Sequence, residues 1–146
     1  MERLSFLLKH AFALLDQATE RELARLSVTG REFAVLTLVD AEGPASQQKL
    51  ARRLGVDRTT MVALIDALEE KRLVSRRRDP SDRRAYIVEA TPAGHKTLQE
   101  ALKTVKLAEQ QALASLTATE SAAFKHTLQR LAQAPPTWDA KPLDRD

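Results

Sequence analysis

The interval between apolar residues changes near residue 72, from the three or four residues of a helix to the two residues of a strand. Residues 58–71 keep the helical interval. Residues 73–76 and 85–90 then read as two short strands, and residues 79–82 between them form the turn-favouring sequence DPSD. The sequence therefore predicts a helix that leads directly into a β-hairpin.

Helical spacing continues on both sides of this hairpin. An amphipathic helix is expected over residues 2–26, and a capping residue marks the start of each later helix. These capping residues are Thr29, Ser46, Asp57, Thr91 and Thr117. The second and third helices are expected to end near Gly43 and Gly55. The predicted fold is mainly α with a small β-hairpin.

Residues 46–71, SQQKLARRLGVDRTTMVALIDALEEK, match the pattern of a helix-turn-helix. Ala51 is small where two helices must cross closely, and Gly55 lies in the turn, where a positive φ is needed. Apolar residues around these two positions supply a buried seam. Structural helical hairpins share the pattern, so the segment alone leaves a purely architectural role open.

The outward face of the second of these helices carries groups that can read DNA. Near its N-terminus this face presents Thr59 and Ala63, and Arg58 and Thr60 flank them. Arginine can pair with a guanine edge, threonine with bases or phosphates, and alanine can touch a thymine methyl group. The alternative is four exposed helix residues without a role. The residues predicted to contact the DNA backbone, which position a protein without specifying sequence, are Ser46, Gln47, Gln48, Arg52, Arg53 and Arg77.

Positive charge is concentrated in the same region. The chain has a net charge of +3, but residues 46–86 hold 11 lysines and arginines against 6 aspartates and glutamates. The rest of the chain is slightly acidic. Such segregation is typical of a module that binds a polyanion, although a basic block also occurs as a solubilising surface.

Other classes of function lack their signatures. The absence of cysteine excludes disulfides, thiol redox sensing and cysteine-ligated zinc. No catalytic motif occurs, and His10, His95 and His126 fall on three separate predicted helices, so no enzyme activity, metal site or cofactor is predicted. No apolar run reaches the roughly 20 residues of a membrane span, and the N-terminus does not resemble a signal peptide, so the expected location is the cytoplasm.

The stretch RRRDPSDRRAY, residues 76–86, packs five arginines into eleven residues. A solvated loop, a disordered basic tail and a nucleic-acid probe are the alternatives. Its position between two strands favours the probe, because an arginine at a hairpin tip can enter the minor groove beside a helix in the major groove. Arg76, Arg77 and Arg78 alternate across a strand, so one or two of them are expected to be solvated or paired with the helix.

The run from Gly55 to Gly94 resembles the core of the MarR family of transcription factors. The wing of that family reads approximately D-P-x-D-R-R-A, followed by an apolar strand and T-x-x-G, and DPSDRRA and TPAG match it here. The resemblance implies a winged helix-turn-helix homodimer that binds a pseudo-palindromic DNA site, often a repressor that a small phenolic or aromatic ligand releases. It also implies that Asp82 orients the wing. One of Arg83 and Arg84 then enters the minor groove, while the other pairs with Asp82 or a phosphate.

The long helices that flank this region have wide apolar faces. Residues 1–28 and 92–134 are expected to act as N- and C-terminal dimerisation helices, and residues 29–91 as the DNA-binding lobe. Residues 135–146 are expected to form an irregular tail. The alternative is that the long helices pack only on their own core.

Two positions depart from the family pattern. Arg72 stands where the family usually has glycine at the end of the recognition helix. Either another residue ends that helix, or Arg72 adopts the left-handed conformation at a cost. Ala63 stands where some relatives carry a polar or basic residue, so base reading is expected to depend more on Arg58, the threonines and DNA shape.

The family usually binds its effectors between the first helix and the winged-helix lobe. Candidates for the wall of such a pocket are Phe6, His10, Phe12 and Phe33, with ordinary dimer-core packing as the alternative for each. A ligand there would act by changing the separation of the two recognition helices. Two other functions stay open at this point: an interaction module that uses the basic face for a protein or RNA, and a ligand-binding protein that does not bind DNA.

Overall fold

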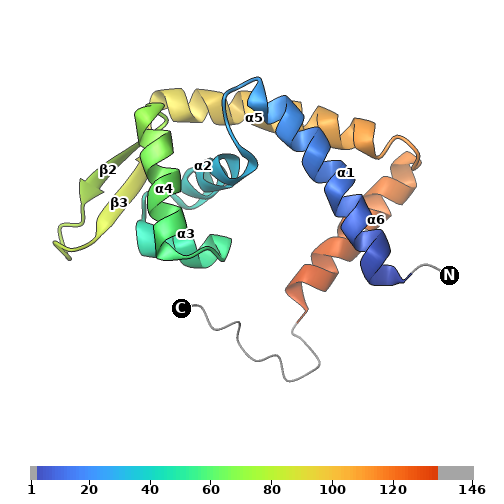
Figure 1. Ribbon diagram of the computed structural model, residues 1–146, viewed down its shortest axis with the longest axis horizontal. Coiled ribbons are helices and arrows are strands. Elements are labelled where there is room, and N and C mark those ends of the chain that lie inside the picture. Colours follow the sequence, from blue (N-terminus) through green and yellow to red (C-terminus); the bar gives the residue numbers. More distant parts are fainter. Residues whose placement is uncertain (1–2, 135–146) are drawn as a thin grey trace.

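The computed structural model describes residues 3–134 and contains the predicted succession of helices and hairpin (Figure 1). The helices are α1 (Leu4–Ala24), α2 (Gly30–Glu42), α3 (Gln47–Leu54), α4 (Arg58–Glu70), α5 (Pro92–Ala112) and α6 (Ala118–Gln133); the strands are β1 (Ala45–Ser46), β2 (Val74–Arg78) and β3 (Tyr86–Ala90). The expected fold class, mainly α with a small antiparallel hairpin, is confirmed. The expected tail at residues 135–146 lies outside the described residues. Within residues 3–134, no helix combines the length and apolar character that a membrane span requires.

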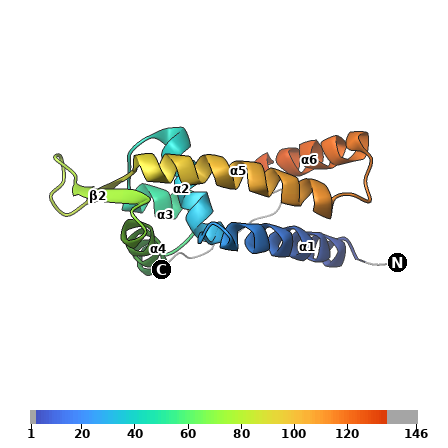
Figure 2. The same ribbon diagram turned by 90° about the horizontal axis from the view of Figure 1, so that it is seen from above.

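The elements form one lobe and one long helical arm (Figures 1 and 2). In the lobe, α2, α3, α4 and the sheet surround an apolar core that includes the fully buried Leu36 and Ile65. α5 begins on this lobe and then runs beside α1 along the arm, where a smaller cluster of Leu23, Ala101 and Val105 joins them. The wing, defined here as β2, β3 and the loop between them, projects from the lobe on the side opposite the arm.

The sheet has three antiparallel strands in the order β1-β3-β2. β1 was not predicted, because two residues are too few for an alternating pattern; it exists only by pairing with β3, with Ala45 opposite Val88. The prediction that the first strand ends at Arg76 was also wrong, since β2 continues through Arg78, which pairs with Tyr86. A run of arginines has no apolar alternation from which the end of a strand could be predicted.

The predicted helix caps are confirmed. The Thr29 hydroxyl accepts a hydrogen bond from the Glu32 backbone N–H at 3.1 Å, and the Glu32 carboxylate accepts the Thr29 N–H at 3.1 Å. Thr117 and Glu120 form the same reciprocal capping box at the start of α6. Ser46, Asp57 and Thr91 each accept a backbone N–H bond at the start of the helix that follows. Side-chain caps therefore begin each helix from α2 to α6.

Arg72 adopts the left-handed conformation, with φ of 61°. Two backbone hydrogen bonds end α4: the Arg72 N–H donates to the Glu69 carbonyl and the Leu73 N–H to the Leu68 carbonyl, both at 2.9 Å. This is the Schellman pattern, which usually has glycine at the left-handed position. Of the two alternatives that the sequence left for the end of α4, the strained arginine is therefore the one that occurs.

Replacing Arg72 with glycine is expected to stabilise the fold by about 1 kcal/mol, because glycine adopts positive φ without the Cβ clash that every other L-residue meets. The free energy of unfolding in urea measures the effect. Arg72→Ala is the matched control, since it removes the same side chain but keeps the Cβ. Equal stabilities of the glycine and alanine variants would show that backbone strain at this position is negligible.

Candidate nucleic-acid interface

α3 and α4 form the predicted helix-turn-helix. Gly55 ends α3 in the left-handed conformation, with φ of 65°, and Asp57 then starts α4. The Asp57 carboxylate accepts the Thr60 N–H at 2.6 Å, and the hydrogen bonds from Thr60 lower the pKa of Asp57. Met61 and Ile65 on the opposite face of α4 are buried in the lobe. The N-terminal turn of α4 is therefore fixed at one end and directed outward.

The predicted base-reading residues lie on the surface of α4. Arg58, Thr59 and Ala63 are exposed, and Thr60 is half-buried beside its cap. Because the apolar face of α4 is buried, the face with short polar side chains is exposed. The helical spacing in the sequence predicted this arrangement. The N–H groups of this helix end also favour an anion such as phosphate.

A groove of about 540 Å³ lies between α3, α4 and the wing. The predicted residues that line it are Ser46, Gln47, Gln48, Arg52, Arg58, Asp82 and Arg84. Arg76 and Tyr86, which the sequence reasoning did not assign to the interface, form part of its wall. Four arginines against one aspartate make this groove basic. The structure therefore brings most of the predicted DNA-binding residues from three elements to one concave surface.

Two predicted backbone-contacting residues are engaged in ion pairs outside this groove. The Arg53 guanidinium binds the Glu42 carboxylate at 2.6 Å, and Lys49 binds the same carboxylate at 2.9 Å. These two cations lower the pKa of Glu42. Arg77 lies 3.9 Å from the Glu89 carboxylate, and both side chains are about half exposed. A weak surface pair of this kind can exchange for a phosphate.

The wing tip is closed by hydrogen bonds that its two aspartates organise. Asp79 accepts bonds from the Ser81 N–H and hydroxyl, at 2.9 and 2.7 Å, and these lower the pKa of Asp79. Asp82 accepts the Arg84 N–H at 3.0 Å. Across the base of the tip, the Asp79 N–H donates to the Ala85 carbonyl at 3.0 Å. The tip is thus a structured loop with exposed arginine side chains.

Asp82, the residue that the family resemblance implied as the organiser of the wing, contacts the backbone of the tip. Its carboxylate binds the backbone of Arg84, and no guanidinium group within residues 3–134 pairs with it. The side chains of Arg83 and Arg84 are both exposed, but only Arg84 lines the groove. The Arg83 carbonyl is instead held by the Arg78 guanidinium at 2.6 Å. The two arginines therefore have different surroundings before any DNA is bound.

Arg76 is paired with the recognition helix, as predicted for one or two of the three consecutive arginines. Its guanidinium donates to Asp66, to Glu69 at 3.2 Å and to Gln47 at 3.1 Å. Burial alone would lower the pKa of Arg76, but the hydrogen bonds to the two carboxylates outweigh burial and raise it. The ring of Tyr86 lies 5.7 Å from the Arg76 guanidinium and 5.0 Å from that of Arg78.

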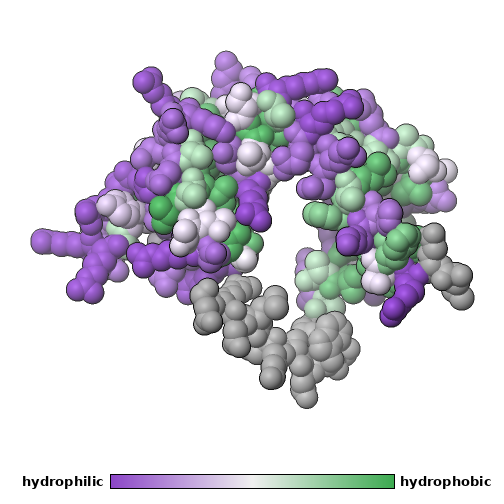
Figure 3. Space-filling model, in the orientation of Figure 1, coloured by the Kyte–Doolittle hydropathy of each residue, from purple (hydrophilic) through white to green (hydrophobic). Residues whose placement is uncertain are grey.

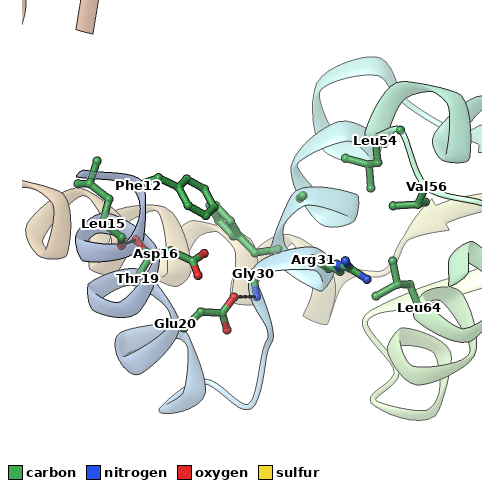
Figure 4. A pocket seen from close by; sticks show the side chains of 13 residues that line it. Phe12, Leu15, Asp16, Thr19, Glu20, Gly30, Arg31, Leu54, Val56 and Leu64 are labelled. Carbon is green, nitrogen blue, oxygen red and sulfur yellow. Dashed lines mark hydrogen bonds between the residues drawn. The ribbon is translucent and has the colours of Figure 1, made fainter. Parts of the chain in front are cut away.

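A second cavity, of about 750 Å³, lies between α1, the start of α2 and the helix-turn-helix (Figure 4). Phe12 and Phe33, two of the four candidates for the wall of an effector pocket, line it. Asp16 and Glu20 lie along its α1 side, and the Glu20 carboxylate accepts the Gly30 N–H at 2.8 Å. Apolar side chains from the end of α3 and from α4 line the opposite side (Figure 4).

Phe6 and His10, the other two candidates for the wall of an effector pocket, do not line this cavity. Their rings contact each other, with centroids 4.2 Å apart, closer to the N-terminus of α1. Successive helix residues are rotated by about 100°, so Phe12 lies about 200° around the helix from His10. The face of α1 that carries Phe12 is therefore not the face that carries His10. This difference could have been predicted from the sequence spacing.

The helix-turn-helix, the adjacent β-hairpin and the basic groove between them define a winged-helix DNA-binding protein. The chain belongs to the MarR family, whose model matches residues 28–86. It is 27% identical to the HTH-type transcriptional repressor NicR of Pseudomonas putida, over 89% of this chain and 82% of that protein. A crystal structure of MarR is 30% identical, with a TM-score of 0.82 over 90% of this chain and 96% of that one. A mutant MarR from E. coli complexed with operator DNA is 25% identical, with a TM-score of 0.78 over 88% and 92% of the two chains.

Proposed function

We propose that this protein is a dimeric transcriptional regulator that binds a pseudo-palindromic DNA site in the cytoplasm and has no catalytic activity. The observation that carries the proposal is the basic groove between α3, α4 and the wing, which brings the exposed Arg52 and Arg58 of the helices to the exposed Arg84 of the wing. The relatives named as transcriptional repressors favour repression as its effect. Within residues 3–134, no group of three or more potential metal ligands lies together.

In this function the N-terminal turn of α4 enters the major groove. Arg58 pairs with a base edge there, while Thr59, Thr60 and Ala63 make the shorter contacts that their side chains allow. Residues of β1, α3 and β2 bind the sugar-phosphate backbone, namely Ser46, Gln47, Gln48, Arg52, Arg53 and Arg77. The wing reaches the neighbouring minor groove with Arg83 or Arg84. The groove supports this division, because α3 and α4 line one side of it and the wing lines the other.

The helical arm supplies the dimer interface. Several apolar side chains of the arm are exposed in the single chain, among them Leu4 at 71%, Phe12 at 67% and Leu131 at 62%. Figure 3 shows apolar surface over the helices at the arm end and hydrophilic side chains around the wing. Exposed apolar surface of this extent is typical of a protein-protein interface. We therefore assign residues 1–28 and 92–134 to dimerisation and residues 29–91 to DNA binding.

The cavity beside Phe12 and Phe33 is the proposed effector site, and a small aromatic molecule is its proposed ligand. One side of the cavity belongs to α1 in the arm and the other to α3 and α4 in the DNA-binding lobe. A ligand that bridges these sides changes the preferred angle between arm and lobe, and with it the spacing of the two recognition helices. The ligand raises the population of dimers in which the spacing of the two recognition helices no longer matches the duplex, and these dimers dissociate from DNA.

The function is tested by selecting duplexes from a random-sequence library with the purified protein. The expected product is an inverted repeat with half-sites about one helical turn apart, bound by two chains as measured by analytical ultracentrifugation. Repeating the titration with small aromatic compounds tests the effector site. Enrichment of no sequence over a scrambled duplex, or binding of a single chain per site, would contradict the proposal.

A further inference from the structure

Arg76 occupies a position unlike that of the arginines at the wing tip. Its side chain is 20% exposed, and it projects from β2 toward α4 instead of toward solvent. One Nη atom donates to the Gln47 side chain, while the other donates to the carboxylates of Asp66 and Glu69. Its backbone N–H also donates to Glu69, at 3.1 Å. Most of its hydrogen-bonding capacity is thus used inside the protein.

These contacts join three parts of the DNA-binding surface. Gln47 is the first residue of α3, while Asp66 and Glu69 lie three residues apart and share one face of α4. Tyr86, against the Arg76 guanidinium, is the first residue of β3. A planar guanidinium can bind several acceptors in fixed directions, which an ammonium group cannot do. Arg76 therefore holds both helices and both wing strands at one point.

Apart from the pairing of β3 with β1 at Ile87 and Val88, few contacts position the outer half of the wing. Beyond Val74, which is buried, the residues of β2 are exposed or half-buried, and the tip contacts mainly itself. A two-stranded hairpin is only marginally stable without further packing. We propose that Arg76 is a positioning residue for DNA binding, which sets the distance between the recognition helix and the wing so that both enter adjacent grooves together. This inference rests on the DNA-binding function proposed above.

The charges of the network lead to an unusual expectation. Asp66 and Glu69 lie on the recognition helix, where an unpaired carboxylate would repel the phosphates of bound DNA. Electrostatics alone therefore predicts that neutralising both carboxylates tightens DNA binding. The positioning role of Arg76 predicts the opposite, because the same substitutions release the wing. The sign of the change in affinity distinguishes the two.

The experiment compares affinities for the tightest duplex selected with the wild-type protein. Arg76→Met is expected to weaken binding by at least about tenfold, since each dimer loses the contact twice. The double variant Asp66→Asn, Glu69→Gln is expected to weaken binding as well. Glu70→Gln, which removes one carboxylate of the same helix outside the network, is the control for the loss of negative charge and is expected to leave binding unchanged or slightly tighter. Arg76→Lys keeps the charge and is expected to remain weaker than wild type.

A double-mutant cycle shows whether Arg76 acts through the wing. When Arg83 and Arg84 are already alanine, Arg76→Met is expected to have little further effect on affinity. An additive loss, with the salt dependence of binding reduced separately by each substitution, would mean that Arg76 contacts phosphate directly and would overturn the proposal. So would tighter binding by the double carboxylate variant, which remains a test even where Arg76→Met fails to fold. Failure of the wild-type protein to bind any selected duplex would instead contradict the proposed function itself.

Discussion

Replacing Gly94 with alanine is expected to lower the free energy of unfolding by about 3 kcal/mol, because the new methyl group would meet a fixed carbonyl. A Cβ at this position would lie 2.0 Å from the Leu73 carbonyl oxygen and 3.0 Å from its carbon. That carbonyl cannot move freely, since it accepts the Thr91 N–H at 3.0 Å. The junction between α4, the wing and α5 would have to open. Alanine usually stabilises a helix relative to glycine by at most about 1 kcal/mol, which does not offset this cost.

Gly30→Ala provides the matched control. Gly30 also lies in the first turn of a helix, but the Cβ there would meet only the Glu20 carboxylate, which is the end of a flexible side chain. Urea unfolding of the two variants is therefore expected to differ by at least about 2 kcal/mol, with Gly94→Ala the less stable. Equal stabilities would mean that the α4–α5 junction adapts to a methyl group, and that the close approach to Leu73 has no energetic importance.

The sequence was most informative where a local rule determines the structure. The capping pair of Thr29 and Glu32 predicted the start of α2 because a hydroxyl and a carboxylate three residues apart each accept one free backbone N–H. Gly55 predicted the turn between α3 and α4 because a positive φ favours glycine. The alternation of Arg76, Arg77 and Arg78 predicted that these side chains divide between faces, and Arg76 is the one that pairs with the helix. Each of these features depends on neighbours only a few residues away.

Contacts between distant segments were missed. β1 pairs Ala45 with Val88, and no pattern within two residues can indicate a partner so far along the chain. Gly94 was recognised only as part of a family motif, because its steric role depends on the position of the Leu73 carbonyl. Part of the network around Arg76 could have been recognised in the sequence, because Asp66 and Glu69 are three residues apart on the helix that precedes the arginines. Their partner on the wing became evident only when β2 was placed against α4.

Alanine at either wing-tip arginine is expected to weaken operator binding by about a hundredfold while the dimer stays folded. Arg83 and Arg84 are both exposed, so their removal leaves no buried group without a partner. Each dimer loses the side chain twice, and an arginine that contacts DNA contributes about 1–3 kcal/mol per copy. The measurement is a fluorescence anisotropy titration of the selected duplex at several salt concentrations. Arg25→Ala is the control, because it removes an exposed arginine that pairs with Glu22 and does not line the groove.

The salt dependence and the base preference separate the roles of the two arginines. An arginine that neutralises a phosphate reduces the slope of log affinity against log salt by about one, hence by about two for the dimer. An arginine in the minor groove also prefers A·T base pairs, whose narrow groove has the more negative potential. The substitution that abolishes discrimination between A·T and G·C pairs under the wing therefore identifies the inserted residue. Since Arg84 lines the groove beside Asp82 and Arg83 does not, the two variants are expected to differ in this preference. Unchanged affinity and slope in both variants would exclude the wing from the interface and leave α4 as the element that reads DNA.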